Sequence, residues 1–459
     1  MIEYILKFSI YLILPLSCLS LKAQTVQYIM PEETNEHEGT WLQWPHNDLY
    51  GPWYIDDIEP TFVAMTNALQ SGENVHIIAK DSTELSRVIN VLNSTGVPLG
   101  NIDFYVHPTD DIWSRDNGPM FVYDQNDNIS IIDWGFNGWG LDTPYSNCDI
   151  IPESVGGDLG IPVIDLNGVV LEGGAIEHDG NGTMIATRSS ITHTSRNPNL
   201  SEAQIEDSIT RYMGITKFIW LDGVYGLEIT DMHIDGFVKF ANDTTIVTMD
   251  STDLLYWDVI GADINTLYNA TNNGGDAYNY VTLPLTQNNV VTSYNDNLGY
   301  KGSYVNYYIG NDVVLMPTYN DPMDASALAI LQAVYPNRTV VGVDVRNLYA
   351  YGGMIHCVTQ QQPVDLNAIG LNELDLNQFR FYPNPSEDYT MIKYSIQSNQ
   401  LLTIEVYNSL GQLVKTVAQN SNKNKIKINN AGINSGVYYY NLLINGLKVH
   451  TQKIIINRK

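Results

Sequence analysis

One structural unit recurs along this chain: two strands joined by a polar turn, then a helix, then another strand. Hairpins are predicted at residues 120–123 with 129–134, 175–177 with 183–187, 237–240 with 245–249, and 304–309 with 313–316. Their turns contain the Asn, Asp and Gly residues that hairpin reversals need. The first strands begin 55, 62 and 67 residues apart. This period predicts α/β modules arranged around an axis, as in a propeller, with a doubly wound α/β sheet as the alternative.

The segments after two hairpins complete the unit. Ser201 is predicted to cap a helix at 202–212 that leads to a strand at 217–221, and Asp324 is predicted to cap a helix at 325–335 that leads to a strand at 339–343. A fifth, partly degenerate unit is predicted at the start of the chain, with strands at 41–44 and 75–79 around a helical stretch at 61–69.

Polar clusters stand at equivalent places in these modules. Asp116 precedes the first hairpin, Glu172 the second, and His233 with Asp235 the third. In an axial arrangement these clusters converge on one central pocket. Cys357 follows the last predicted strand, in a Gly-rich segment, and is expected at the same place.

These residue types predict a site for a planar cation. Paired carboxylates at Asp116, Asp235 and Glu172 match the N–H donors of a guanidinium group. His233, two residues from Asp235, is expected on the same side of a strand, where it can protonate a leaving group. Cys357 is a candidate nucleophile for the carbon between the nitrogens, provided that an imidazolium or the bound cation favours its thiolate.

Taken in order, the motifs resemble the family of agmatine deiminases and bacterial peptidylarginine deiminases, which are guanidine-modifying hydrolases. The similarity lies in Met-Pro-Glu at 30–32, His-Glu-Gly-Thr-Trp at 37–41, Trp-Ser-Arg-Asp-Asn-Gly-Pro at 113–119, Leu-Glu-Gly-Gly at 171–174, His-Ile-Asp at 233–235 and Gly-Met-Ile-His-Cys-Val-Thr-Gln-Gln-Gln-Pro at 353–363. It covers about three quarters of the chain. The resemblance implies a five-module, pentein-like α/β propeller.

The resemblance also implies roles for individual residues. Cys357 is expected as the nucleophile, His233 as acid and base, Asp116 and Asp235 as guanidinium ligands, and Glu172 as a pocket carboxylate. Trp113 and Trp139 are expected to wall the pocket and contact the substrate. The implied reaction releases ammonia through a Cys-linked thiouronium and requires no metal and no organic cofactor. Taken singly, each of these residues is more often structural; together they favour catalysis.

The substrate stays open between agmatine and arginine in proteins or peptides. Agmatine, which would yield N-carbamoylputrescine and serve putrescine biosynthesis, is favoured by segment 133–140, which lacks an arginine that could bind a peptide carboxylate. Two features favour the peptide: the export signals described below, and Met232, which stands where the agmatine branch usually has glycine. A catalytically silent guanidinium-binding protein or an adhesin is the alternative of another class.

The ends of the chain predict export. Residues 1–23 resemble a cleaved signal peptide, with an apolar run after Lys7 and a small residue, Ala23, at the end. Its removal would eliminate Cys18 and leave only Cys148, interpreted as an inert buried thiol, and Cys357, which is too few for a disulfide scaffold. The formal charge of −28 argues against nucleic acid and anionic membranes as partners.

The C-terminal part differs in character. Residues 25–365 are expected to be the catalytic domain, 366–378 a linker, and 379–459 a small all-β sandwich with strands at 391–396, 402–407, 425–428, 437–444 and 448–456. The last domain resembles the type IX secretion sorting domains of Bacteroidetes, which implies the secretion machinery as a partner and a secreted or cell-surface location. No stretch after the signal peptide is long and apolar enough to span a bilayer, so no transmembrane segment is expected in the mature chain. A carbohydrate-binding module is the alternative.

Overall fold

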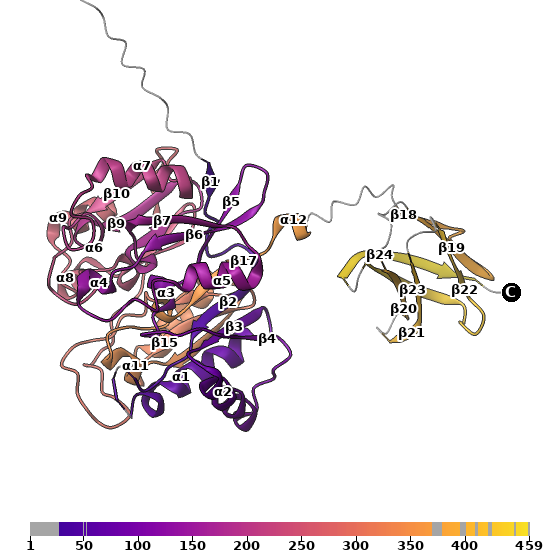
Figure 1. The fold of residues 1–459 in the computed structure, drawn as a ribbon, viewed down its shortest axis with the longest axis horizontal. Helices are drawn as coiled ribbons and strands as arrows, with labels where there is room; N and C mark the ends of the chain where they lie inside the picture. Colours follow the sequence, from indigo (N-terminus) through magenta and orange to yellow (C-terminus); the bar gives the residue numbers. More distant parts are fainter. Residues whose placement is uncertain are drawn as a thin grey trace, which may run out of the picture. The chain divides into compact units, whose positions relative to one another are not determined.

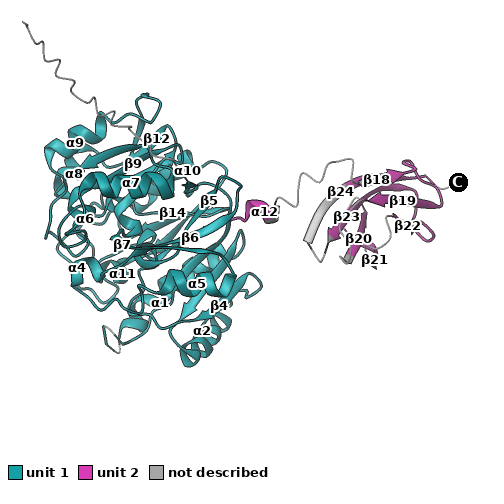
Figure 2. Ribbon diagram, turned by 45° about the horizontal axis from the view of Figure 1, so that its top comes forward, with its two compact units in different colours: residues 1–363 teal, residues 364–459 magenta. Residues whose placement is uncertain are grey.

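The computed structural model describes residues 27–48, 50–51, 53–369, 379–394, 401–408, 412–420, 425–444 and 447–457. The predicted signal peptide, 1–23, and most of the predicted linker lie outside these ranges. Contacts within the chain separate two units, Met1–Pro363 and Val364–Lys459 (Figure 2). Among the helices of the described ranges, none combines the length and apolar character that a bilayer span requires.

The first unit is a propeller of five small sheets (Figure 1). In every sheet an antiparallel pair is extended by a parallel strand, as the recurring sequence unit predicts. The sheets contain, in turn, β1 (Tyr28–Ile29), β5 (Met120–Asp124), β6 (Ile129–Gly135) and β7 (Val163–Val170); β8 (Ile176–His178), β9 (Thr183–Thr187) and β10 (Lys217–Leu221); β11 (Val238–Asn242), β12 (Thr245–Thr248) and β13 (Asn279–Thr282); β14 (Tyr308–Ile309), β15 (Val313–Thr318) and β16 (Thr339–Asp344); and β17 (Gln360–Pro363), β2 (His37–Gln43), β3 (Asn74–Ala79) and β4 (Ile102–Val106).

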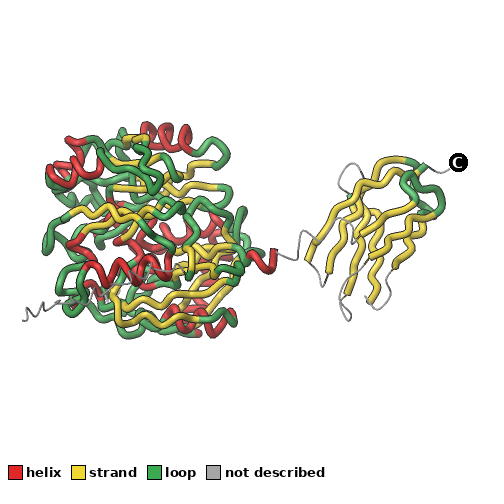
Figure 3. Tube along the Cα trace, turned by 90° about the horizontal axis from the view of Figure 1, so that it is seen from above, coloured by secondary structure: helices red, strands yellow, loops and turns green. Residues whose placement is uncertain are grey.

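Helices connect the strands of each module and are interspersed with them throughout this unit (Figure 3). The longer ones are α1 (Tyr54–Leu69), α2 (Ser82–Thr95), α5 (Ile151–Leu159), α7 (Glu202–Met213), α9 (Gly261–Tyr268) and α10 (Asp324–Val334). The shorter ones are α3 (Ser114–Asn117), α4 (Gly138–Leu141), α6 (Arg188–Ile191), α8 (Ser251–Tyr256), α11 (Arg346–Ala350), α12 (Leu366–Ile369) and the 3₁₀ turns η1 (Gly173–Ala175), η2 (Ile234–Gly236) and η3 (His356–Val358).

The fifth sheet explains why the first module looked degenerate in sequence. Its hairpin partner is not local, because β17, at the end of the unit, pairs antiparallel with β2, at its start. Trp41 is aligned with Gln360, and the Trp41 Nε1–H donates to Gln362 Oε1 at 2.8 Å. The pairing closes the ring of modules and leaves Cys357 directly before the closing strand.

Two details of the predicted modules are wrong. Residues 304–307 are not part of a strand, since Ser303 Oγ donates to the Gly236 carbonyl and Asn306 Nδ2 donates to the Asp235 carbonyl, at 2.8 and 3.2 Å. Asp324 does not cap α10 from outside; it is the first helical residue, and its carboxylate accepts from the Tyr304 hydroxyl and from the Tyr319 N–H. The Ser201 capping box of α7 is confirmed.

The second unit pairs a three-stranded and a four-stranded antiparallel sheet around its own apolar core (Figure 1). The strands are β18 (Phe379–Tyr382), β19 (Tyr389–Tyr394) and β22 (Lys425–Asn429), and then β21 (Leu413–Asn420), β20 (Leu401–Asn408), β23 (Gly436–Ile444) and β24 (Leu447–Ile456). Tyr438 and Tyr440 point into the core while Tyr439 is exposed, so this segment forms no aromatic platform. β18 and β21 were not predicted.

Candidate active site

One cavity of about 490 Å³ collects most of the predicted site residues. Its lining includes Asp116, His233, Asp235 and Cys357 together with the rings of Trp113 and Trp139. The carboxylates and the imidazole come from short helical segments that precede the hairpins, namely α3 and the turn at η2, and the thiol comes from η3 before β17. The predicted convergence on one pocket is therefore observed.

Asp116 and His233 face each other across a glycine. His233 Nδ1 lies 3.5 Å from Asp116 Oδ1, which also accepts the Gly174 N–H at 3.0 Å. A Cβ atom at Gly174 would lie 2.7 Å from both of those side chains. The second glycine of the Leu-Glu-Gly-Gly motif is therefore required, because the side chains of Asp116 and His233 both lie against the backbone at Gly174 and leave no space for a side chain.

Cys357 lies beside Asp235 and Asn306. Its Sγ is 3.8 Å from Asp235 Oδ2 and 3.3 Å from the amide nitrogen of Asn306. The Trp113 ring packs against Gly353, where an added Cβ atom would lie 2.2 Å from the ring, so a side chain does not fit at that position. Trp139 donates its indole N–H to Asp116 Oδ2 at 2.9 Å.

Burial and neighbouring charges shift the pKa values of the ionisable side chains in the site. Burial raises the pKa of Asp116 to about 6. Burial disfavours the imidazolium of His233, but Asp116, Glu172 and Asp235 outweigh it and raise the pKa of His233 to about 9. Burial, together with Asp235 and Asp116, raises the pKa of the Cys357 thiol well above its usual range. These shifts favour the neutral thiol of Cys357 beside the carboxylates.

Glu172 lies behind His233 and does not line the cavity. Its carboxylate is 2.8 Å from His233 Nε2 and is bound by the Arg196 guanidinium, with Nε 2.9 Å and Nη2 3.4 Å away. Arg196 also donates to Asp231 Oδ2 at 2.5 Å. A contact of Glu172 with substrate stays a prediction, whereas its contact with the imidazole is direct.

His233 and Asp235 do not lie on a strand as predicted. Residues Ile234–Gly236 form a 3₁₀ turn in which the Phe237 N–H donates to the Ile234 carbonyl at 3.1 Å. Both side chains nevertheless reach the cavity. The turn follows Met232, whose φ of 68° lies in the left-handed region that favours glycine. Its N–H donates to Glu228 Oε1 at 2.6 Å, which helps to hold this conformation.

Some residues around the site could not be identified from sequence patterns. Asn306 contacts Cys357 from a segment predicted as strand, and Arg196 supports Glu172 from a loop; neither has a motif of its own. His356 could have been identified from the sequence, because it immediately precedes the nucleophile Cys357. Cys148 is buried outside the cavity and accepts from the backbone N–H of Asp110 and of Asp111, as expected of an inert thiol.

Comparisons with known proteins agree with this geometry. Residues 29–363 match the Porphyromonas-type peptidyl-arginine deiminase family, and residues 380–457 match the secretion system C-terminal sorting domain. An agmatine deiminase of Pseudomonas aeruginosa is 32% identical over 363 residues, which cover 74% of this chain and 96% of the relative.

Solved structures show the same similarity. The agmatine deiminase of Enterococcus faecalis superposes with a TM-score of 0.67 at 25% identity, over 73% of this chain and 96% of its own. A Porphyromonas gingivalis protein assigned as an arginine deiminase superposes with a TM-score of 0.65 at 30% identity, over 73% of this chain and 98% of its own. The chain therefore belongs to the Porphyromonas-type peptidyl-arginine deiminase family and carries a C-terminal sorting domain of a secretion system.

Proposed function

We propose that the first unit hydrolyses the C–N bond of a guanidinium substrate, with release of ammonia and formation of a ureido product. The observation that carries this proposal is the placement of a thiol, an imidazole and two carboxylates around one cavity. Asp116 and Asp235 bind the guanidinium N–H groups, and the planar cation compensates two buried negative charges that are otherwise costly.

Substrate binding also activates the nucleophile. Burial, together with the Asp235 and Asp116 carboxylates, raises the pKa of the Cys357 thiol and favours its neutral form. A guanidinium bound between them adds a positive charge beside Cys357 Sγ, which lowers the pKa of the thiol and favours the thiolate. Cys357 thus stays unreactive until a guanidinium is bound between the two carboxylates.

The reaction proceeds in two halves. The thiolate of Cys357 adds to the guanidinium carbon, and the C–N bond breaks as His233 gives its proton to the departing nitrogen, which leaves as ammonia. The S-alkylthiouronium that remains is then attacked by water, from which neutral His233 takes a proton. Collapse of this adduct breaks the C–S bond and releases the ureido product, while the hydroxyl proton of the adduct passes to the leaving sulfur and restores the thiol of the free enzyme. Glu172 holds the imidazole ring in place throughout.

Agmatine is the first candidate substrate, supported by the deiminases of P. aeruginosa and E. faecalis named above. Arginine in a peptide is the second candidate. The family match supports it, and so does the lining of the cavity, which includes the exposed rings of Tyr256 and Tyr300 that a peptide chain can contact. Lys301, stacked 5.4 Å from the Tyr256 ring centre, can bind a carboxylate there.

The test offers the purified protein agmatine, free arginine, and peptides with internal or C-terminal arginine, and measures ammonia and ureido product beside Cys357→Ala. Turnover of agmatine alone, lost in the variant, establishes agmatine as substrate. Preference for a peptide establishes the second candidate. Silence with all four substrates, combined with saturable binding, would leave a guanidinium-binding protein and refute the enzymatic proposal.

The division of the chain completes the proposal: a signal peptide at 1–23, a catalytic domain at 25–365, a linker at 366–378 and a type IX sorting domain at 379–459 that directs the protein to the cell surface or the medium. The match of residues 380–457 supports the last element. Deletion of 379–459 is expected to retain the protein in the periplasm, as measured by fractionation. Unchanged export would refute the sorting role.

A further inference from the structure

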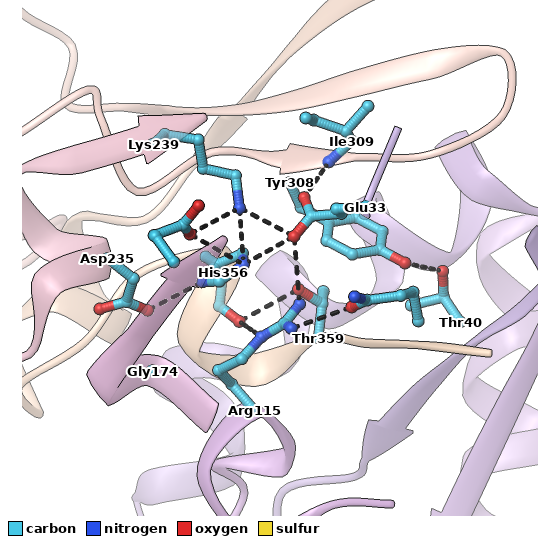
Figure 4. A network of polar contacts seen from close by, with 12 residues as sticks. Glu33, Thr40, Arg115, Gly174, Asp235, Lys239, Tyr308, Ile309, His356 and Thr359 are labelled. Atoms are coloured by element: carbon cyan, nitrogen blue, oxygen red, sulfur yellow. Dashed lines mark hydrogen bonds and ion pairs between the residues drawn. The ribbon is translucent and has the colours of Figure 1, made fainter. Parts of the chain in front are cut away.

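A second cluster of ionisable side chains lies directly behind the nucleophile and outside the cavity. It comprises Glu33, Arg115, Glu177, Lys239 and His356, here called the rear network (Figure 4). Apart from Glu33, these residues are all more than nine-tenths buried. The reaction described above uses none of them. Buried charge of this density is costly, and its presence therefore needs a reason.

His356 connects the rear network to the active centre. Its Nδ1 lies 2.8 Å from Asp235 Oδ2, and its Nε2 lies 2.8 Å from Glu33 Oε2 and 2.7 Å from Lys239 Nζ. Burial disfavours the Glu33 carboxylate, yet Lys239 and His356 outweigh this effect and hold its pKa well below its usual range. The imidazole is thus fixed from both nitrogens.

Hydrogen-bond chemistry determines which nitrogen of His356 carries a proton. The carboxylate of Asp235 can only accept, so Nδ1 must donate to it. At Nε2, a ring that carries a proton donates to Glu33, and a bare nitrogen accepts from Lys239; the two contacts cannot both be hydrogen bonds at once. In either state the Nδ1–H bond to Asp235 is kept.

The oxygen that His356 holds is the one nearest to the nucleophile. Asp235 Oδ2 is the atom 3.8 Å from Cys357 Sγ. The same segment is fixed a second time, since the His356 N–H donates to Asn306 Oδ1 at 3.0 Å and Asn306 Nδ2 lies 3.3 Å from the thiol. A shift of His356 would therefore displace Asp235 relative to Cys357, and small displacements of this kind cost much rate.

We propose that His356 is a positioning residue whose Nδ1–H fixes the Asp235 carboxylate for the incoming guanidinium, while Glu33 and Lys239 hold the ring from its other nitrogen. This inference rests on the proposed deiminase function. It also explains why the rear network contains buried ion pairs: Glu33 and Lys239 keep the His356 imidazole oriented whether or not its Nε2 carries a proton.

A matched pair of variants separates this role from simple packing. In His356→Asn the side-chain amide nitrogen takes the place of Nδ1 and can still donate to Asp235; in His356→Gln it takes the place of Nε2. The expected result is that His356→Asn retains kcat/KM within about tenfold, whereas His356→Gln loses about 100-fold. Both variants are checked for folding by thermal denaturation. Equal losses in two folded variants, or no loss in either, would overturn the proposal.

Two measurements keep the test decisive. Calorimetry with agmatine and an arginine peptide in the Cys357→Ala background is expected to show weaker binding when His356→Gln is added and little change when His356→Asn is added. Should both histidine variants unfold, ¹⁵N-histidine NMR of the Cys357→Ala protein reads the ring directly: a proton on His356 Nδ1 supports the proposal, and a bare Nδ1 overturns it.

The failure of this inference differs from failure of the proposed function. If the wild-type protein releases no ammonia from any guanidinium, the function fails, and NMR still decides whether Nδ1 holds Asp235. If the wild-type protein turns over and His356→Gln matches it, only the role of His356 fails.

Discussion

The two units of this protein differ most in charge. Residues 364–459 contain ten basic and six acidic side chains, whereas residues 1–363 contain 13 basic and 45 acidic ones. The overall value of −28 thus hides a strongly acidic catalytic part and a basic C-terminal part. Charge of opposite sign on two units of one chain indicates that each is adapted to different contacts, a cationic substrate for the first.

The interiors differ in the same way. The first unit buries ionised side chains such as Arg196 and Lys239 in complete networks. In the second unit, the buried polar residues among those described are Ser386, Thr390 and Asn430, which are neutral. Buried charge is retained where it positions reacting groups, and an apolar core suffices where only a fold is needed.

The largest effect is expected for His233→Gln. Without an imidazole to donate and accept a proton, kcat/KM should fall by about 10²–10⁴-fold, while guanidinium binding persists because both ligand carboxylates remain. Steady-state ammonia release and calorimetry measure the two quantities. Tyr439→Gln, an exposed change in the second unit, is the control and should behave as wild type. Similar losses of kcat/KM in His233→Gln and Tyr439→Gln would contradict the contrast between the two units.

The pH dependence of kcat/KM should show two limbs. With a pKa of about 6, Asp116 becomes protonated below that pH and no longer pairs with the guanidinium, so activity falls toward acid. With a pKa of about 9, His233 loses its proton above that pH and cannot protonate the leaving nitrogen, so activity falls toward alkali. Each limb should approach tenfold per pH unit. A flat acid side down to pH 4.5, with the fold intact by circular dichroism, would contradict the role of Asp116.

A smaller effect is expected from salt. The acidic first unit should draw in a cationic substrate, so kcat/KM for agmatine should fall by roughly threefold between about 0.01 and 0.15 M ionic strength, as the Debye length shortens from about 30 to about 8 Å. Alkylation of Cys357 by uncharged iodoacetamide should not change with salt. An equal dependence for both reagents would show that the charge of the unit does not steer the substrate.

The smallest effect is expected from removal of residues 364–459. Since the described residues that line the cavity all belong to the first unit, kcat/KM should stay within about twofold of the intact protein. Parallel assays of purified intact and truncated protein provide the check. A large loss of kcat/KM in the truncated protein would mean that the second unit contributes to catalysis and would contradict the functional distinction between the two units.

Local sequence signals predicted much of the fold and of the site. Hairpins with polar turns, the capping box at Ser201 and the clusters around Asp116 and Asp235 depend on neighbours in sequence, and the structure contains them. The arrangement of clusters before equivalent hairpins was enough to predict their convergence with Cys357.

What escaped prediction depends on distant contacts. The partner of β2 lies at the other end of the unit, so no local pattern could reveal it. Asn306 leaves the predicted strand because tertiary hydrogen bonds override the β propensity of the tyrosines and valine beside it. Arg196 meets Glu172 only in space, through a pairing that the spacing of residues does not encode.

The closing strand has a consequence for the order of folding. The hairpins of the other four modules join neighbouring residues and can form early, but β17 pairs with a strand more than 300 residues away, and contacts of such separation form late. Cys357 precedes that strand by only a few residues. A chain still incomplete or partly folded would therefore bind and process no substrate, and the reactive centre comes into being only when the two ends of the ring meet.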